Sequence, residues 1–242
     1  TELCVNPTEA TRSLPAWLSE RLGVTFQFGV LASAVEESGG RPEIVFSDGR
    51  KQTFDRVIVC GGSDFQTLYP EILAGSGLVA CKLQMLAIDG SAADYHLGTH
   101  LASGLTLRHY RIFEICQSLA KLRQRIAEET PELDEYGIHV MASQNNHGDL
   151  ILGDSHEYGN QIEPFDDVRI DEWILRELRT LLRLPSWQLS RRWHGIYAKH
   201  PELPVFQHEV RRGVHIFAGT GGSGMTMSFG LAEDFWNGID NG

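Results

Sequence analysis

Apolar residues recur at helical spacing in three parts of the chain. Residues 169–182 show the clearest amphipathic pattern, and residues 115–129 show a second one. The apolar stripe of the first pattern consists of Ile170, Trp173, Ile174, Leu178, Leu181 and Leu182. A third helix is predicted near the start of the chain, where Asn6 can cap it, Pro15 should kink it and Gly23 can end it.

Runs of β-branched and aromatic residues between turn residues predict the strands. These runs are residues 24–28, 43–54, 56–60, 78–89, 137–144, 148–155, 187–198, 205–210 and 213–219, and a helix at about 225–238 follows them. The run at 43–54 predicts a hairpin, in which Asp48-Gly49 favours a type I′ turn. Because the order shows no regular βαβ alternation, the predicted fold is α/β of the mixed α+β kind, with a mixed, largely antiparallel sheet in the middle.

The composition limits the binding partners and the cellular compartment to be expected for this protein. The 242 residues carry a formal net charge of −11, which argues against nucleic acid or an anionic membrane as the main partner. The cysteines Cys4, Cys60, Cys81 and Cys116 form no C-x-x-C pair, so free thiols in a reducing compartment are predicted. The sequence shows no apolar run of transmembrane length and no signal-peptide pattern, which makes the cytoplasm the expected location.

The ten histidines show none of the standard metal-ligand spacings. His96 and His100 are four residues apart, but Gly98 lies between them and no helical pattern supports a shared face. Asp154 and His156 resemble a turn more than a ligand pair. No metal is therefore predicted, and the lack of a G-x-S-x-G motif gives no support to a serine nucleophile.

A glycine-rich stretch near the end of the chain raises the main question of function. Gly219, Gly221 and Gly224 spell G-x-G-x-x-G between a predicted strand and a predicted helix. Only 18 residues follow Gly224, too few for the helix, second strand and ribose-binding acid of a dinucleotide-binding unit. A helix N-terminus beside glycines suits a phosphate, a carboxylate or the carbonyl edge of a flavin. The alternative is a helix packed closely on a strand with no ligand, and the sequence leaves both open.

Four stretches together carry a resemblance to a known family. They are "AGTGGSGMTMSFGLAE" at the end, "RVIVCGG" (56–62), "ASAVEE" (32–37) and "RRWHGIYAKHPELPVF" (191–206). The chain resembles FAD-dependent amine and amino-acid oxidoreductases of the D-amino-acid oxidase, glycine oxidase and sarcosine oxidase type. Residues 136–159 are most similar to a branch of this family linked with phosphonate breakdown.

The resemblance implies a domain organisation and a set of cofactor contacts. Residues 1–77 with 197–242 would form part of an FAD-binding domain, and residues 78–196 a substrate-binding domain. The N-terminal unit with the family's own G-x-G-x-x-G is missing, so this chain is expected to lack much FAD affinity or to bind none. The implied cofactor-binding residues are Val35, Cys60, Gly61, Gly62, Trp193, Gly195, Gly219, Gly221, Gly222, Ser223, Gly224, Met225 and Thr226. FAD is expected to be non-covalent, since residues 195–201 contain no cysteine.

The resemblance also implies an activity: hydride transfer to the flavin from the carbon next to nitrogen in a small amine, an amino acid or an aminophosphonate. The candidate catalytic residues are His194, Tyr197 and Thr226, and the candidate substrate-binding residues are Gln84, Arg108, Tyr110 and Gln144. If residues 105–113 form a strand, Arg108 and Tyr110 share one face. Thr226 stands where several relatives carry a basic residue, so the resemblance does not decide whether the enzyme is an oxidase or a dehydrogenase. The electron acceptor and the oligomeric state are also left open. The alternative function is a non-catalytic domain that binds a small anion or a partner chain.

Overall fold

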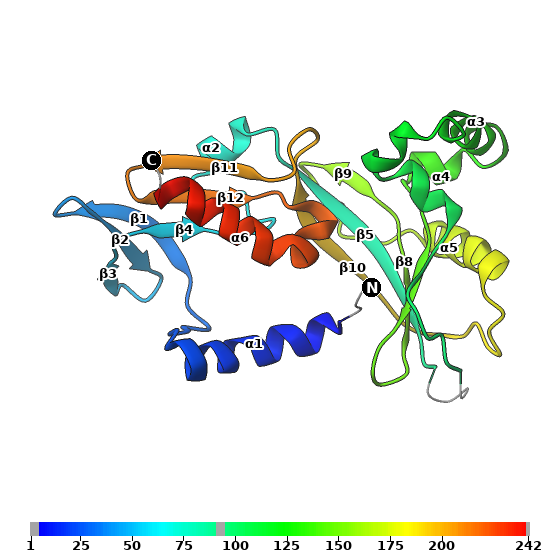
Figure 1. The fold of residues 1–242 in the computed structure, drawn as a ribbon, viewed down its shortest axis with the longest axis horizontal. Coiled ribbons are helices and arrows are strands. Elements are labelled where there is room, and N and C mark those ends of the chain that lie inside the picture. Colours follow the sequence, from blue (N-terminus) through cyan, green and yellow to red (C-terminus); the bar gives the residue numbers. More distant parts are fainter. Residues whose placement is uncertain (1–4, 91–94, 241–242) are drawn as a thin grey trace. The chain divides into compact units, whose positions relative to one another are not determined.

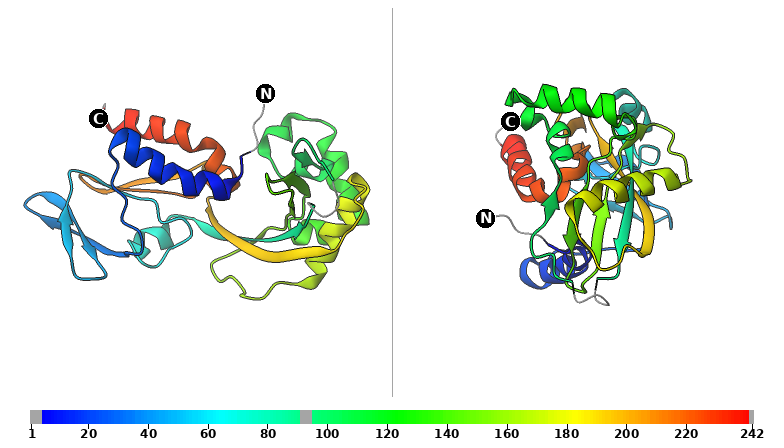
Figure 2. Two further views of the ribbon diagram at one scale, coloured as in Figure 1. Left: turned by 90° about the horizontal axis from the view of Figure 1, so that it is seen from below. Right: turned by 90° about the vertical axis from the view of Figure 1, so that its right-hand side faces the viewer.

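The computed structural model describes residues 5–90 and 95–240 of the chain. These residues form two compact units (Figures 1 and 2). Unit 1 consists of the described parts of Thr1–Phe26, Lys82–Tyr158 and Ile162–Gly195, and unit 2 of Gln27–Cys81, Gly159–Gln161 and the described part of Ile196–Gly242. These limits lie near the predicted boundaries at 78 and 196, except that the first 26 residues belong with the central part of the chain. The roles of the two units in binding cofactor and substrate stay predictions.

Unit 2 contains two three-stranded sheets and two helices. One sheet has the order β1-β2-β3 and the other β11-β12-β4. The elements are β1 (Ala32–Ser38), β2 (Arg41–Phe46), β3 (Lys51–Thr53), β4 (Val57–Val59), α2 (Pro70–Gly75), β11 (Phe206–Arg211), β12 (Val214–Ala218), the 3-10 turn η4 (Gly221–Ser223) and α6 (Gly224–Asp240). Helix α6 lies along β12 (Figures 1 and 2), where Phe235 meets the rings of His215 and Phe217 edge to face at centroid distances of 5.5 Å. The core of unit 2 gathers around Val57, Val59 and Ile216.

The predicted hairpin at 43–54 is present, as strands β2 and β3. Its turn differs from the predicted type I′, which requires positive φ at two residues. Gly49 alone has positive φ, at +85°, and its N–H donates to the carbonyl of Phe46 at 2.9 Å. The loop is therefore a longer turn that ends in a left-handed glycine, and the Asp48 carboxylate fixes it by accepting the N–H of Arg50 at 3.0 Å.

Unit 1 is built on the larger sheet, whose order is β10-β5-β8-β7-β6, with β9 also paired to β5. Its strands are β5 (Val79–Ile88), β6 (Leu101–Ala102), β7 (Met141–Gln144), β8 (Leu150–Gly153), β9 (Glu157–Gly159) and β10 (Leu189–Lys199), of which β5, β9 and β10 extend into unit 2. The β5–β8, β7–β8 and β6–β7 pairs are antiparallel, as predicted for the middle of the chain.

Helices cover this sheet through one apolar core. They are α5 (Val168–Leu181), α3 (Leu119–Glu129), α4 (Glu132–Glu135), η2 (Gly104–Arg108) and η3 (Arg111–Ile115). Figure 1 shows α5 beside the sheet, and its residues Ile170, Ile174 and Leu178 pack there with no exposed surface. The predicted stripe is therefore confirmed except at Leu181, which is 45% exposed.

The first helix has the predicted bounds. Helix α1 (Pro7–Leu22) begins after Asn6, whose side chain accepts the N–H of Thr8 at 3.0 Å, and it ends at Gly23 with φ +68°. Asn6 also donates to Asn146 of unit 1 at 2.6 Å. The helix has no buried residue in this structure, because its apolar residues Leu14 and Trp17 are both about half exposed.

The predicted strand at 24–28 is wrong, and the strand considered for 105–113 is not formed. Residues 24–28 form no strand, and the first strand begins at Ala32. Residues 105–113 form the 3-10 helices η2 and η3, so strand alternation does not place Arg108 and Tyr110 on a common face. The side chain of Ser103 accepts the N–H of Leu105 at 3.2 Å and starts the first of these helices, a local capping contact that competes with strand pairing.

We predict that Ile174→Ala lowers the free energy of unfolding by about 2–5 kcal/mol, because it leaves a cavity between α5 and the sheet. Leu181→Ala, on the same helix but half exposed, should cost less than about 1 kcal/mol. Urea unfolding followed by circular dichroism measures both. Equal losses would contradict the packing of α5.

Candidate functional site

Two strands of unit 2 end in glycine turns at the same edge of their sheet. Strands β4 and β12 are parallel neighbours, with Val57 opposite Val214 and Val59 opposite Ile216. The chain leaves β4 through Cys60-Gly61-Gly62 and leaves β12 through Gly219. Carboxyl ends of parallel strands are where open α/β sheets bind their ligands. The structure thus brings two of the sequence-predicted glycine segments to one edge.

Two glycines of the loop after β12 are explained by packing inside unit 2. Gly219 has φ +78°, and a Cβ there would lie well inside van der Waals contact with Leu78. A Cβ on Gly224 would overlap the hydroxyl of Thr220 in the same way. These contacts match the alternative in which the glycines serve close packing of helix on strand.

The two glycines between them have open space. Gly221, at φ +60°, has its nearest heavy atom outside the loop 3.8 Å from an ideal Cβ, on Lys199. For Gly222 the nearest atom is the hydroxyl oxygen of Tyr197, also at 3.8 Å. The first turn of α6 follows directly, and its residues Met225 and Thr226 are exposed. The N–H groups at this helix end therefore face a surface that a ligand can approach.

Two further predicted cofactor residues of unit 2 have structural contacts. The carbonyl of Val35, on β1, accepts a hydrogen bond from Arg211 at 2.8 Å, and its side chain packs on the core of unit 2. Gly62 has φ +61° in the turn after β4, which the Asp64 carboxylate braces by accepting the N–H groups of Gln66 and Thr67 at 3.0 Å.

In unit 1, strand β10 carries a histidine held by a carboxylate. His194 Nδ1 lies 2.8 Å from Asp166 Oδ1, and Trp193 and Gly195 flank it. The ammonium of Lys82, whose side chain is 2% exposed, lies 3.0 Å from the same carboxylate oxygen. Lys82 also donates to the carbonyls of Glu163 and Phe165. Asp166 is thus fixed by the buried Lys82 and can orient the His194 ring.

A second buried network engages Gln84. Its amide NH₂ donates to Asp171 Oδ1 at 3.1 Å and to the carbonyl of Asp167 at 3.0 Å, while its oxygen accepts the N–H of Asp167 at 2.8 Å. Arg192 donates to the other Asp171 oxygen at 2.7 Å. The amide of Gln84 is therefore occupied at the start of α5, and a substrate would have to displace these partners.

The guanidinium of Arg108, a predicted substrate-binding residue, is hydrogen-bonded to partners inside unit 1. Its Nη2 donates to the carbonyls of Ile138 at 2.7 Å and Leu133 at 3.1 Å, and Nη1 pairs with Asp134. Burial lowers the pKa of Arg108, although the charge of Asp134 works against this shift. Tyr110 keeps 42% of its surface exposed, and burial of the rest of the side chain raises its pKa.

Gln144, at the end of β7, fixes a loop. It accepts the N–H of Leu97 at 2.8 Å and donates to the carbonyls of Tyr95 at 2.7 Å and Gly148 at 2.9 Å. It also lines a surface pocket with Gly90, Tyr95, His96, Gly98 and Asn145. The ligand roles predicted for Gln84, Arg108, Tyr110 and Gln144 all stay predictions.

Comparison with known families adds a decisive observation. The family model described as "FAD dependent oxidoreductase" matches residues 1–235. The chain belongs to this FAD-dependent oxidoreductase family. The resemblance found in the sequence is thereby confirmed at the level of the family, whose cofactor is FAD. A search of curated protein sequences gives no significant match.

Solved structures share the fold. Glycine oxidase from Geobacillus kaustophilus is 11% identical, with a TM-score of 0.56 over 89% of this chain and 49% of that chain. L-proline dehydrogenase from P. horikoshii is 16% identical, with a TM-score of 0.64 over 92% of this chain and 52% of that chain. NikD, described as an unusual amino acid oxidase, is 12% identical, with a TM-score of 0.59 and coverages of 88% and 52%. The mixed α/β fold is confirmed, and the chain spans about half the length of these structures.

The exposed glycine loop of unit 2 fits a part of FAD. Gly221 and Gly222 have no side chains to cover their backbone N–H groups, and the first turn of α6 follows them, which suits an electron-rich carbonyl edge or a phosphate. The edge shared with Gly61 and Gly62 suits another stretch of the same extended cofactor. In the described part of the chain, no helix combines the length and apolar character needed to span a membrane.

The sequence did not point to the residues that hold the candidate site residues in position. Lys82, Asp166 and Asp171 became candidates only when the fold placed them beside His194 and Gln84, because no motif links them along the chain. Asp154, which the sequence pattern assigned to a turn, is buried, and burial raises the pKa of its carboxyl to about 7. Cys60 and Cys116 are exposed free thiols, as expected, whereas Cys4 lies outside the described residues.

We predict opposite outcomes for two glycines of the loop. Gly219→Ala should lower the free energy of unfolding by about 2–4 kcal/mol, because it combines positive φ with a clash against Leu78. Gly222→Ala should change it by less than about 1 kcal/mol, since the site is open. Thermal and urea unfolding measure both. A tolerated Gly219→Ala would show that Leu78 does not set this turn.

Proposed function

We propose that the full-length protein is an FAD-dependent oxidoreductase that oxidises the C–N bond of a small amine or amino acid. The observation that carries this proposal is the family match over residues 1–235, in which the β12–glycine-loop–α6 segment presents open backbone N–H groups. The names of two similar structures, a glycine oxidase and a proline dehydrogenase, support amino-acid chemistry. Bound FAD supplies a two-electron acceptor for the substrate carbon next to nitrogen.

Residues 221–226 would hold the cofactor through its ring. Their N–H groups and the positive end of α6 would stabilise negative charge on the electron-rich edge of a flavin. Tyr197 lies beside Gly222 and bounds this surface, and Thr226 adds an exposed hydroxyl in the first turn of α6. Cys60, Gly61 and Gly62, at the end of β4, would contact a more distant part of FAD.

His194 is the residue we propose to handle a proton. Its ring is fixed by Asp166, which in turn is held by buried Lys82, so the imidazole has a defined orientation and a carboxylate to balance a positive charge. Amine oxidation requires the substrate nitrogen to lose a proton, and a ring nitrogen of this histidine would accept it.

A narrower proposal concerns the substrate. We propose that it carries a phosphonate or a carboxylate, on the basis of the similarity of residues 136–159 to the phosphonate-linked branch. Of the four predicted substrate-binding residues, Tyr110 keeps a large exposed surface, whereas the guanidinium of Arg108 already binds two carbonyls and Asp134. An acidic substrate would therefore rely on cations other than Arg108.

We predict that Gly222→Val in the full-length protein raises the Kd for FAD by at least about tenfold, because the branched side chain covers the N–H groups of the loop. Gly238→Val is the matched control. It places the same side chain in the last turns of α6, where no atom lies within 4 Å of a Cβ. Titration of the apoprotein with FAD, followed by flavin fluorescence, measures both. Unchanged affinity in Gly222→Val would remove the loop from the cofactor site.

Anaerobic bleaching of the flavin's visible band by a panel of amines tests the reaction itself. We predict bleaching by an N-substituted amine or amino acid, and faster bleaching by an aminophosphonate than by its uncharged counterpart. Admitting oxygen then separates an oxidase, which regains the band at once, from a dehydrogenase. A flavin-loaded protein that no amine bleaches would favour the non-catalytic alternative.

A further inference from the structure

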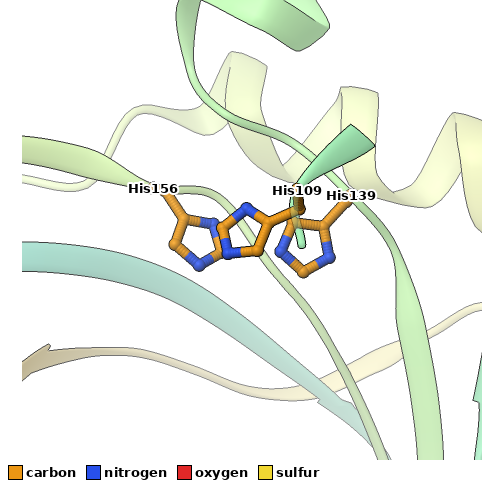
Figure 3. Close-up of side chains that lie close together, drawn as sticks. All are labelled: His109, His139 and His156. Atoms are coloured by element: carbon orange, nitrogen blue, oxygen red, sulfur yellow. The ribbon is translucent and has the colours of Figure 1, made fainter. Parts of the chain in front are cut away.

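Three histidines far apart in the sequence meet in unit 1 (Figure 3). His109 follows helix η2, His139 precedes strand β7 and His156 lies between β8 and β9. One ring nitrogen from each lies within 4.8 Å of the others, and the ring centroids are 4.1–4.8 Å apart. His139 and His156 are buried, and His109 is half-buried. Three imidazoles inside a protein form a set of ligands that suits a divalent transition metal.

A carboxylate lies beside two of these three histidines. Asp154 Oδ1 lies 3.8 Å from His139 Nε2, and Asp154 Oδ2 lies 3.9 Å from His156 Nε2. Asp154 is itself buried, with 8% of its surface exposed. The backbone pairing of His139 with Asp154, at 3.2 and 3.3 Å, keeps the two segments in register. The three histidine nitrogens can supply three ligands of a tetrahedral zinc ion, and Asp154, which neighbours two of them, is the candidate for the fourth.

The tautomer of His156 leaves its Nε2 atom available as a metal ligand. Its Nδ1 lies 3.1 Å from the carbonyl oxygen of Gly137, and a carbonyl can only accept, so Nδ1 carries the hydrogen. The lone pair of the neutral ring is then on Nε2, the atom near Asp154. A histidine that donates its other N–H to a backbone carbonyl is the usual arrangement behind a metal ligand.

We propose that His109, His139, His156 and Asp154 form a structural site for a divalent transition metal of the zinc class. Ligand nitrogens around tetrahedral zinc lie about 3.3 Å apart, so binding draws the three rings together by roughly 1 Å. The ion would tie η2, the start of β7 and the β8–β9 connection to one another. This inference is independent of FAD and of the proposed reaction.

Metal analysis of the untagged full-length protein tests the site. After EDTA treatment, addition of Zn²⁺ and gel filtration, we expect one zinc per chain in the wild type and loss of that zinc in His139→Gln and His156→Gln. His100→Gln, an exposed histidine outside the set, is the matched control and should keep the metal. Asp154→Asn should weaken binding by about 10–100-fold if the carboxylate is the fourth ligand.

Two further readouts keep the test valid if a buried variant fails to fold. Co²⁺ added to the wild type should give the intense visible bands of a tetrahedral site, and the half-buried His109→Gln should weaken or change them. Zn²⁺ at a hundredfold excess over its Kd should raise the Tm of the wild type by about 5–10 °C and leave that of His109→Gln nearly unchanged. Zinc lost on gel filtration, a weak octahedral cobalt spectrum, or equal retention by the wild type and His109→Gln would each overturn the proposal.

Discussion

The parallel pairing of β4 with β12 is the constraint on which the proposed cofactor site depends. These strands are separated by more than 150 residues, and their register places Val57 opposite Val214 and Val59 opposite Ile216. Parallel strands end at a common edge, so the turn after Cys60 and the loop after Ala218 meet there whatever their side chains. A slip of one residue would turn Val57, Val59 and Ile216 away from the core of unit 2. The apolar packing of these strands therefore also fixes where the glycines lie.

The glycines of the loop after β12 are of two kinds: two are packed against neighbouring atoms, and two leave the backbone accessible. Gly219 and Gly224 have no room for a side chain, because Leu78 and Thr220 occupy that space. Gly221 and Gly222 have room, and their lack of side chains leaves the backbone open to a ligand. The close-packing alternative therefore accounts for Gly219 and Gly224, whereas a ligand at Gly221 and Gly222 stays a prediction. Close packing at its ends holds α6 in place, and the open middle presents the N–H groups at the start of that helix.

In unit 1, buried charged residues hold other side chains in position. Lys82 holds the segment 163–166 and its carboxylate Asp166, and Asp171 joins Gln84 to Arg192. Removing one partner from such a pair leaves a charge uncompensated inside the protein, which is strongly destabilising. These residues therefore orient His194 and the start of α5 and are poor candidates for direct contact with substrate. The four side chains proposed to bind zinc are joined by the same fold, across three segments that share no motif.

Local patterns were enough to predict much of the fold. The cap at Asn6, the stripe of α5 and the glycine at position 49 depend on contacts within a few residues or on a regular period of burial. The runs that form β4, β5, β7, β8, β10, β11 and β12 were also recognisable, whereas the short strands β6 and β9 were not predicted. The family resemblance likewise came from short segments in order. The predicted strand at 24–28 and the strand considered at 105–113 are absent because tertiary pairing, not β propensity, decides whether such a run joins a sheet. The sequence by itself determined the capped and amphipathic helices and the glycine loop, because their signals are local. Tertiary structure alone decided that Arg108 turns inward, that Gln84 is enclosed and that His109, His139 and His156 meet, because strand register and burial bring distant residues together.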